Sequence, residues 1–281
     1  MAFLRNLLRL ALWLSTLGTV SANAADFRFV GTEKMSALRM QGPIETGDLD
    51  RLIFELSQQQ DPLAAKRFFQ ERQILWVNSV GGSVEEALKI ASFVRKSLIP
   101  VHVLGRCESA CFLILAAAVE RGFVGRNVGI HRPYFADEGS RSLSVEESRR
   151  RYAQMSARYY SMLEEFEVPR QITDKMRSMA SSEIHYLSPL EEELMGMRQP
   201  WFEQHLIARC GLDKSREAAM FREIKNRSLD RNWEIPADYQ DYRSRVNRCT
   251  EKLTYTVGRD TYFEEAELLV QRKRSGQPKT K

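Results

Sequence analysis

The strongest constraint on the fold is an unbroken apolar run from Phe112 to Val119, which follows the sequence Cys-Glu-Ser-Ala-Cys at residues 107–111. A helix that is apolar all round has no face for solvent, so it must be buried on every side. Ser109 therefore stands at the entrance to a buried helix. A lone serine in that place is more often a helix cap than a nucleophile, so its meaning depends on the residues around it.

Predicted strands and helices alternate between Ile74 and His131. Residues 74–77 form a short β-prone apolar run, typical of a buried parallel strand. Residues 101–104 and 128–130 predict two further strands. One helix is predicted after the capping-box sequence Ser-Val-Glu-Glu at residues 83–86, and another after Ser109. This alternation predicts an α/β layered fold with parallel strands.

Three candidate catalytic elements follow the ends of these predicted strands. The Gly81-Gly82 turn lets backbone N–H groups approach a reacting oxygen, as an oxyanion hole requires. Ser109 offers a hydroxyl nucleophile, and His131 offers the base that a serine needs. Each has a simpler structural interpretation when taken alone. Because the carboxyl ends of parallel strands meet at one edge of a sheet, their positions favour a common site.

Residues 1–24 have the parts of a secretory signal peptide. Arg5 and Arg9 precede the apolar stretch Leu10–Val20, which is shorter than the roughly 20 residues that span a bilayer. Ala22-Asn23-Ala24 supplies small residues for cleavage. An uncleaved membrane anchor is the less favoured alternative. We therefore predict a periplasmic or secreted protein.

The charge and cysteine content narrow the partners and the compartment. The chain has 42 basic and 37 acidic residues, an excess too small and too scattered to predict a nucleic-acid partner. Four cysteines follow the leader, which in an exported chain suggests two disulfides. Of three possible pairings we favour Cys107–Cys111 and Cys210–Cys249, since positions i and i+4 of a helix lie about 6 Å apart. Buried free thiols at the first pair are the alternative. We predict no metal site and no cofactor, because no metal-ligand or phosphate-loop motif is present.

The rest of the chain is predicted to divide into three parts. Residues 25–200 form the α/β domain, and residues 201–270 form a mostly helical C-terminal region with helices near 214–226 and 261–273. The polar, basic residues 271–281 are predicted to be a disordered tail. Within the α/β domain, we expect the acidic residues 191–193 to form a solvated face. His185 is expected either at the surface or near the site.

Four blocks of this sequence resemble the proteolytic subunit of the Clp protease. Residues 78–84 are similar to its N-S-P-G-G-S-V turn, and Ser109-Ala110 with the following apolar helix is similar to its nucleophile helix. Gly-Ile-His-Arg-Pro at residues 129–133 resembles its histidine segment. Tyr-Leu-Ser-Pro-Leu-Glu-Glu at residues 186–192 resembles the segment after its catalytic aspartate. The blocks occur in the family's order across residues 37–197.

The resemblance implies a ClpP- or crotonase-like β-β-α spiral and a serine hydrolase or peptidase. It makes Ser109 the nucleophile and His131 the base, with the N–H groups of Gly82 and Ala110 as the oxyanion hole. It implies a peptide or protein substrate and a possible homo-oligomer. Export separates the chain from the family's ATP-driven unfoldase, so no ATPase partner is expected.

This sequence also departs from the family pattern. Val80 replaces the family's proline, and the position of the catalytic aspartate falls on Ile184. Glu183, one residue away, is our choice for the third catalytic residue, and Asp174 lies a few helical turns earlier. Loss of the acid in such a triad can cost about 10⁴ in rate.

Two functions from different classes therefore remain open. The first is an exported Clp-protease-like serine peptidase. The second is a catalytically inactive ClpP-fold binding or assembly module of the cell envelope. An acyl-thioester binder is a third possibility, which export disfavours because coenzyme A is a cytosolic substrate.

Overall fold

The computed structural model describes residues 24–32, 35–57, 74–124, 127–134, 143–227 and 233–274. Nearly all of the predicted leader, and residues 275–281 of the predicted tail, lie outside these ranges. In the part of the chain that is described, no helix has the length and apolar character needed to cross a membrane.

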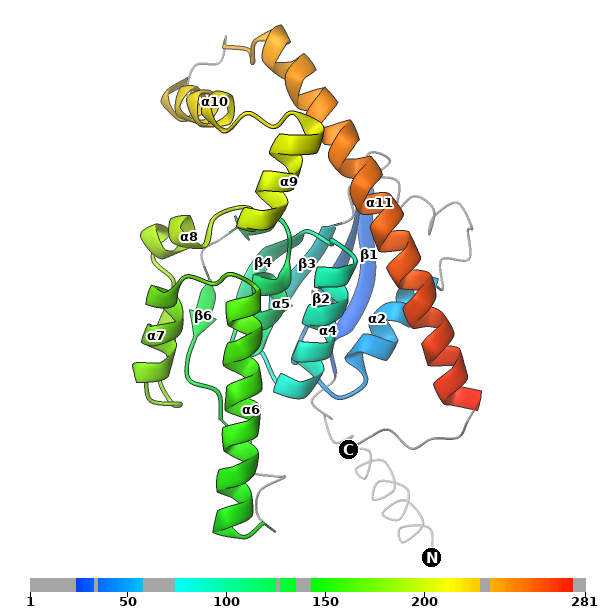
Figure 1. Cartoon of the computed structure of the whole chain (residues 1–281), viewed down its shortest axis with the longest axis vertical. Coiled ribbons are helices and arrows are strands. Elements are labelled where there is room, and N and C mark those ends of the chain that lie inside the picture. The colour runs from blue at the N-terminus through cyan, green and yellow to red at the C-terminus, as the bar shows by residue number, and fades with distance from the viewer. Residues whose placement is uncertain are drawn as a thin grey trace, which may run out of the picture.

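A mixed sheet lies at the centre of the molecule, with helices packed around it (Figure 1). Its strands run in the order β1-β2-β3-β4-β6-β7, and β5 pairs with the first half of β4. The pairs β3–β4 and β4–β6 are parallel, as the sequence predicted, and β2–β3 is parallel too. The edge pairs β1–β2 and β6–β7 are antiparallel. The strands are β1 (Asp26–Thr32), β2 (Met35–Gln41), β3 (Ile74–Ser79), β4 (Val101–Glu108), β5 (Arg121–Val124), β6 (Val128–Ile130) and β7 (His185–Tyr186).

The helices of the α/β part cover the sheet and enclose its core. They are α2 (Asp48–Ser57), α4 (Val84–Lys96), α5 (Cys111–Ala117), α6 (Val145–Glu165), α7 (Arg170–Ser178) and α8 (Pro189–Met195). Every residue of α5 is inaccessible to solvent, as its apolar sequence predicted. Ser83 caps α4 by accepting a hydrogen bond from the N–H of Glu86. This cap starts the helix immediately after the Gly81-Gly82 turn.

A buried arginine joins three helix ends. Arg121, at the start of β5, is 1% exposed. Its guanidinium donates hydrogen bonds to the carbonyl oxygens of Ala116 in α5, Phe166 after α6 and Met195 in α8. Carbonyls at helix C-termini lack partners within the helix, so a cation there is favourable. Burial, followed by repulsion from Arg95, lowers the pKa of Arg121 to about 10. Arg121 remains protonated at neutral pH.

The C-terminal region consists of α9 (Pro200–Cys210), α10 (Lys214–Arg227) and α11 (Ala237–Arg274). The 38-residue α11 packs on α9, α2 and α4 and runs along the outside of the α/β part (Figure 1). The predicted helix near 261–273 was too short, and residues 271–274 belong to α11 and not to a tail. Only a few apolar positions of this helix are buried, which weakened the periodic signal.

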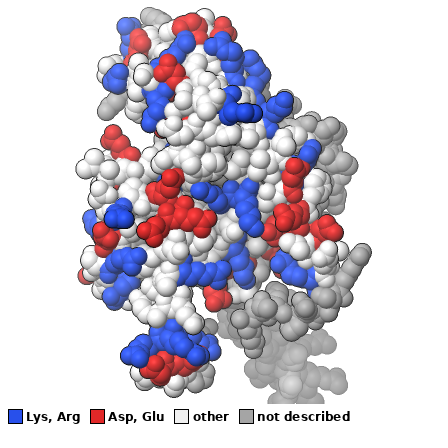
Figure 2. All heavy atoms as spheres, in the orientation of Figure 1, with Lys and Arg blue, Asp and Glu red and all other residues white. Residues whose placement is uncertain are grey.

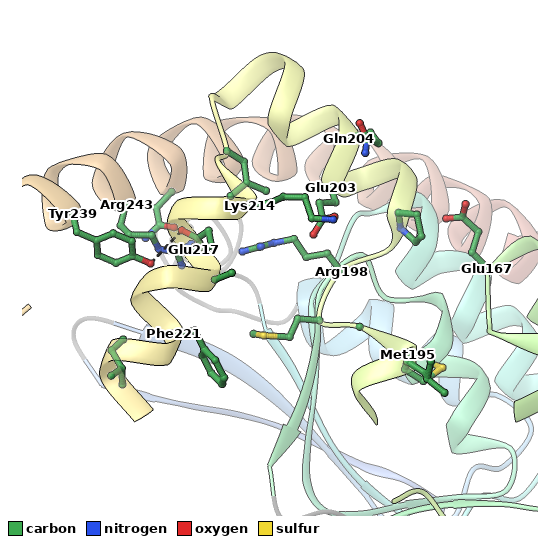
Figure 3. Close-up of a pocket in the computed structure, with 18 of the residues that line it drawn as sticks. Glu167, Met195, Arg198, Glu203, Gln204, Lys214, Glu217, Phe221, Tyr239 and Arg243 are labelled. Atoms are coloured by element: carbon green, nitrogen blue, oxygen red, sulfur yellow. Dashed lines mark hydrogen bonds and ion pairs between the residues drawn. The ribbon is translucent and has the colours of Figure 1, made fainter. Parts of the chain in front are cut away.

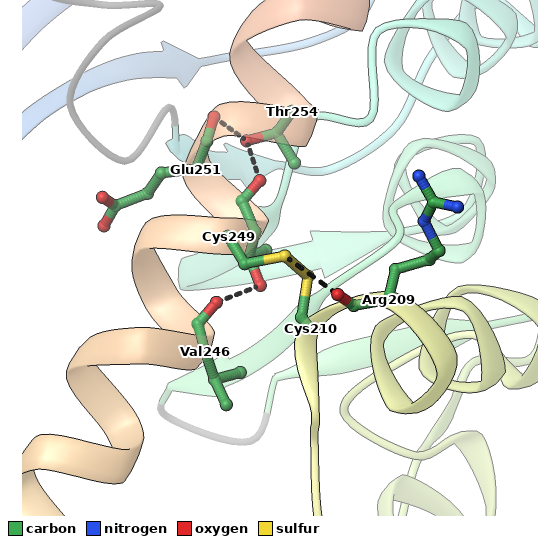
Figure 4. The surroundings of a disulfide bond; sticks show 7 residues. Arg209, Cys210, Val246, Cys249, Glu251 and Thr254 are labelled. Carbon is green, nitrogen blue, oxygen red and sulfur yellow. Dashed lines mark hydrogen bonds between the residues drawn. A yellow bond between two sulfur atoms is a disulfide. The ribbon is translucent and has the colours of Figure 1, made fainter.

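The C-terminal helices share a hydrophobic cluster with the α/β part. Leu98, which follows α4, and Val119, which follows α5, pack with apolar residues of α9, α10 and α11. A disulfide between Cys210 and Cys249 joins the end of α9 to α11, as the favoured pairing predicted (Figure 4). Figure 4 also shows the sulfur of Cys249 directed at the carbonyl of Arg209. The helical region is therefore attached to the α/β part by packing, while the disulfide links α9 to α11 within the region.

Candidate active site

Ser109 lies on a tight turn between β4 and α5. Its φ angle is 56°, in the left-handed region that non-glycine residues rarely occupy. Such a conformation costs about 1–3 kcal/mol and persists only where the surroundings impose it. Two backbone hydrogen bonds contribute: the N–H of Ser109 donates to Gly129 at 2.9 Å, and its carbonyl accepts from Phe112 at 3.0 Å. Strained turns of this kind are concentrated at functional sites.

The Gly81-Gly82 turn packs against the Ser109 turn, and its geometry requires both glycines. Their φ angles are 90° and 142°. A Cβ at residue 81 would lie 2.6 Å from the Cβ of Ser109. A Cβ at residue 82 would lie 2.2 Å from the carbonyl oxygen of Ile44. Neither distance is sterically possible, so the two turns can approach this closely only without side chains at these positions.

At the place where these turns meet, two backbone N–H groups donate no hydrogen bond to any residue that the structure describes. The carbonyl of Gly81 accepts from Ile44, and the N–H of Ser83 donates to Ile44. The intervening N–H of Gly82 takes no part in this pairing, and within the described ranges it donates no hydrogen bond. The N–H of Ala110 likewise donates none to a described residue. Free N–H donors beside a serine are the components of an oxyanion hole.

These elements surround one pocket of about 300 Å³. Four of the predicted catalytic and oxyanion residues line it: Gly82, Ser109, Ala110 and His131. Glu183 does not. The remaining lining is apolar or aromatic apart from glycine, and consists of Pro43, Val80, Gly81, Val84, Pro133, Tyr134, Tyr159 and Ile184. Among the described lining residues, only His131 has an imidazole, the side chain that most often serves as a general base.

His131 follows β6 and is held by a backbone acceptor. Its Nδ1 lies 2.8 Å from the carbonyl oxygen of Arg132. A carbonyl can only accept, so Nδ1 carries the proton and the neutral ring keeps a lone pair on Nε2. The ring also contacts Tyr134, with 5.5 Å between the two ring centroids. Among the described residues, no hydrogen bond yet joins Ser109 to His131. Such contacts often tighten only when substrate binds.

The sequence puts the family's aspartate position on Ile184, with Glu183 as the choice for the third catalytic residue. Ile184 lines the pocket one residue before β7, which pairs with β6 through Ile130 and His185. Glu183 is exposed, and its carboxylate accepts a hydrogen bond from the N–H of Ala180 at 3.2 Å. The Arg132 carbonyl could not have been found from the sequence, because any residue there supplies the same acceptor.

A second histidine is bound by a carboxylate outside the pocket. His185 Nε2 lies 2.9 Å from Glu191, which also accepts hydrogen bonds from Ser188 and Lys175. Burial favours the neutral acid, but the Ser188, His185 and Lys175 hydrogen bonds outweigh it and lower the pKa of Glu191 to about 2. The Glu191 side chain is 16% exposed, so it is not part of the solvated face that the sequence predicted. The Ser-x-x-Glu spacing of this capping box was the available signal.

A larger groove lies away from this chemistry. Its volume is about 1040 Å³, and residues of α8, α9, α10 and α11 line it (Figure 3). Most of the charged side chains around it form ion pairs: Lys214 with Glu203, Arg243 with Glu217, and Arg198 with Glu120. The lining residues that the structure describes include no serine, cysteine or histidine. Chemistry is therefore better assigned to the smaller Ser109 pocket.

Surface charge and metal-ligand geometry add no further site. Figure 2 shows basic and acidic side chains intermixed over the visible face, without a broad patch of one sign. On α6, Arg149, Arg150 and Arg151 pair with Glu146 and Glu147. No cluster of three metal-ligating side chains occurs in the described ranges.

Comparison with known proteins gives a likeness at the level of the fold. No family model matches this chain, and no curated protein does. Among solved structures, it is similar to a variant of ClpP1 from Listeria monocytogenes, with 19% sequence identity and a TM-score of 0.42. The match covers 58% of this chain and 88% of the other. What the Ser109 pocket does has to come from its own residues.

Proposed function

We propose that this chain is an exported serine hydrolase of the Clp-protease type that acts on peptides or small protein segments. One observation carries the proposal: Ser109, on a left-handed turn, shares a pocket with His131 and with two free N–H groups. Nucleophile, base and oxyanion donors are the three components that acyl transfer requires.

In the proposed reaction, Ser109 Oγ attacks the carbonyl carbon of the scissile bond while His131 Nε2 takes its proton. The N–H groups of Gly82 and Ala110 bind the oxyanion that forms. His131 then gives the proton to the leaving amine, which departs and leaves an acyl-serine. Water hydrolyses that ester in a second cycle, with His131 again as base.

The third role in this proposal belongs to the carbonyl of Arg132 and not to Glu183. A hydrogen bond to Nδ1 fixes the ring orientation and the tautomer that leaves Nε2 free. The Glu183 carboxylate is held by the N–H of Ala180 instead.

Further properties of the proposed enzyme follow from its pocket and its disulfides. The apolar lining favours uncharged substrate groups next to the scissile bond, and no metal or cofactor is needed for the steps above. The two disulfides are compatible with an oxidising compartment. We also propose that the chain forms a homo-oligomer and works without a nucleic acid or an ATPase partner.

A fluorophosphonate probe, which reacts only with activated serines, tests this function. We expect labelling of the oxidised protein, and none with Ser109→Ala or His131→Ala. Ser144→Ala and His185→Ala are matched controls, because Ser144 only caps α6 and His185 is bound to Glu191. Equal labelling of Ser109→Ala and wild type would refute the proposed nucleophile.

The alternative is a catalytically inactive binding or assembly module. Ile184 at the expected acid position and the groove beside α10 favour it. A folded, oxidised protein that resists the probe at all pH values from 6 to 9 would support this alternative over the enzyme.

A further inference from the structure

A disulfide spans the turn that carries Ser109. It joins Cys107, the penultimate residue of strand β4, to Cys111, the first residue of α5. The two Cα atoms are 5.2 Å apart, and both residues are fully buried. Ser109 is the middle residue of the five. Among the described cysteines, the other two are bonded to each other far from this pocket.

The bridge restricts the turn in a way that local hydrogen bonds do not. Four residue steps of extended chain reach about 13 Å, so a 5.2 Å separation requires the chain to fold back at its centre. Ser109 occupies that centre with its φ of 56°. The strand before it is anchored, because the N–H of Cys107 donates to Asn127. Because the disulfide links Cys107 to Cys111, it fixes the start of α5 relative to this anchored strand.

We propose that the Cys107–Cys111 disulfide positions the nucleophile and the oxyanion donor, so that the protein is an active hydrolase only when this bond is oxidised. The proposal rests on the function proposed above. Ser109 and Ala110 lie inside the ring that the bridge closes, so both move if the turn relaxes. Cys107 and Cys111 are positioning residues in this scheme, since neither lines the pocket.

Relaxation is expected because the folded turn is held against a local preference. Without the bridge, Ser109 can leave the left-handed region. The Cβ of Ser109 can then move away from Gly81, which it closely approaches in the folded turn. Reduction by a dithiol gives the bridge two electrons and two protons, yielding two thiols and an oxidised dithiol. A chain kept reduced before export would thus have a misplaced serine, and oxidation after export would activate it.

The test compares two double variants that each remove one disulfide. Cys107→Ala with Cys111→Ala should lower the second-order labelling rate about 100-fold, the loss typical of a 1 Å misplacement. Cys210→Ala with Cys249→Ala should label at the wild-type rate. Cys107→Ala with Cys111→Val restores buried volume without the bond, and should stay slow. A wild-type rate in this folded variant would show that packing alone sets the turn and would overturn the proposal.

A redox experiment complements the variants and avoids any change at residues 107 and 111. In the Cys210→Ala, Cys249→Ala background, Cys107 and Cys111 are the two cysteines left in the sequence. The bridge at the turn is then the one disulfide that can form within the chain. This protein is unfolded, reduced with dithiothreitol and refolded with and without oxidant. Labelling should return only after oxidation, and the kcat for a peptide ester should fall in the reduced form with little change in KM. Equal labelling of both refolded forms would overturn the inference, whereas absent labelling in the oxidised wild type would instead overturn the proposed function.

Discussion

The Cys210–Cys249 disulfide offers a quantitative test of how a cross-link between α9 and α11 stabilises the protein. Its cysteines are 39 residues apart, whereas those of the active-site bridge are 4 apart. In the chain-entropy account, cross-linking a loop of this larger size stabilises the folded state by about 4 kcal/mol. The same account gives about 2 kcal/mol for the small ring. Removing the remote bond should therefore destabilise the protein more than removing the bond at Ser109.

The expected size of the effect can be measured by thermal and urea unfolding. For a chain of this length, about 4 kcal/mol corresponds to a lowering of Tm by about 8–16 °C. Circular dichroism reports the helices. Tryptophan fluorescence includes the signal of Trp201 at the start of α9, whose ring centroid lies 4.7 Å from the Arg95 guanidinium. Both probes should shift together in Cys210→Ala, Cys249→Ala.

The control is the variant without the Cys107–Cys111 bond, which should lose less stability but more labelling. Opposite orders of stability and activity in these two variants separate a structural disulfide from a positioning one. A Tm change below 2 °C on removing the remote bond, or a larger change on removing the local one, would refute the loop-entropy reasoning.

Three further predictions concern single residues. Gly82→Ala should abolish probe labelling, because its Cβ would collide with Ile44 and displace an oxyanion donor; wild-type labelling by the folded variant would contradict this. Arg121→Met should cost about 3–5 kcal/mol in urea unfolding, since three buried carbonyls lose their donor; a cost below 1 kcal/mol would argue against its joining role. Glu191→Gln should be less stable than wild type at pH 6. Because the folded-state pKa of Glu191 is lowered from 4.5 to about 2, that difference should shrink as pH falls from 4.5 towards 2; a difference that is constant with pH would refute it.

The sequence predicted the elements whose patterns are strong and local. Strand β3 and the buried α5 have unbroken apolar runs, and the Gly81-Gly82 turn is recognisable from its two adjacent glycines. The long α11 was underestimated, because its few buried positions include Tyr239, Tyr242 and Val246 spread along a largely polar surface. The four-residue strand β5 was not predicted, since it begins at buried Arg121, a residue type that rarely lies in a core.

The residues of the candidate site also differ in how far the sequence could predict them. Gly82, Ser109, Ala110 and His131 were predicted from recognisable patterns of side chains and glycines. All four line one pocket, and their catalytic roles stay predictions. The partner of His131 was missed because it is a main-chain carbonyl, whose presence depends on the path of the chain after β6. Tertiary geometry alone decides such contacts.

The neutral partner of His131 bears on the choice between enzyme and binding module. When an aspartate in a serine-protease triad is replaced by asparagine, the loss of about 10⁴ arises from the wrong histidine tautomer. Here the Arg132 carbonyl accepts from Nδ1, so the tautomer that leaves Nε2 unprotonated is favoured. What a carbonyl lacks is the full negative charge that stabilises the imidazolium in the transition state. The expected deficit is therefore smaller than 10⁴, and Ile184 at the acid position slows the proposed chemistry without removing it.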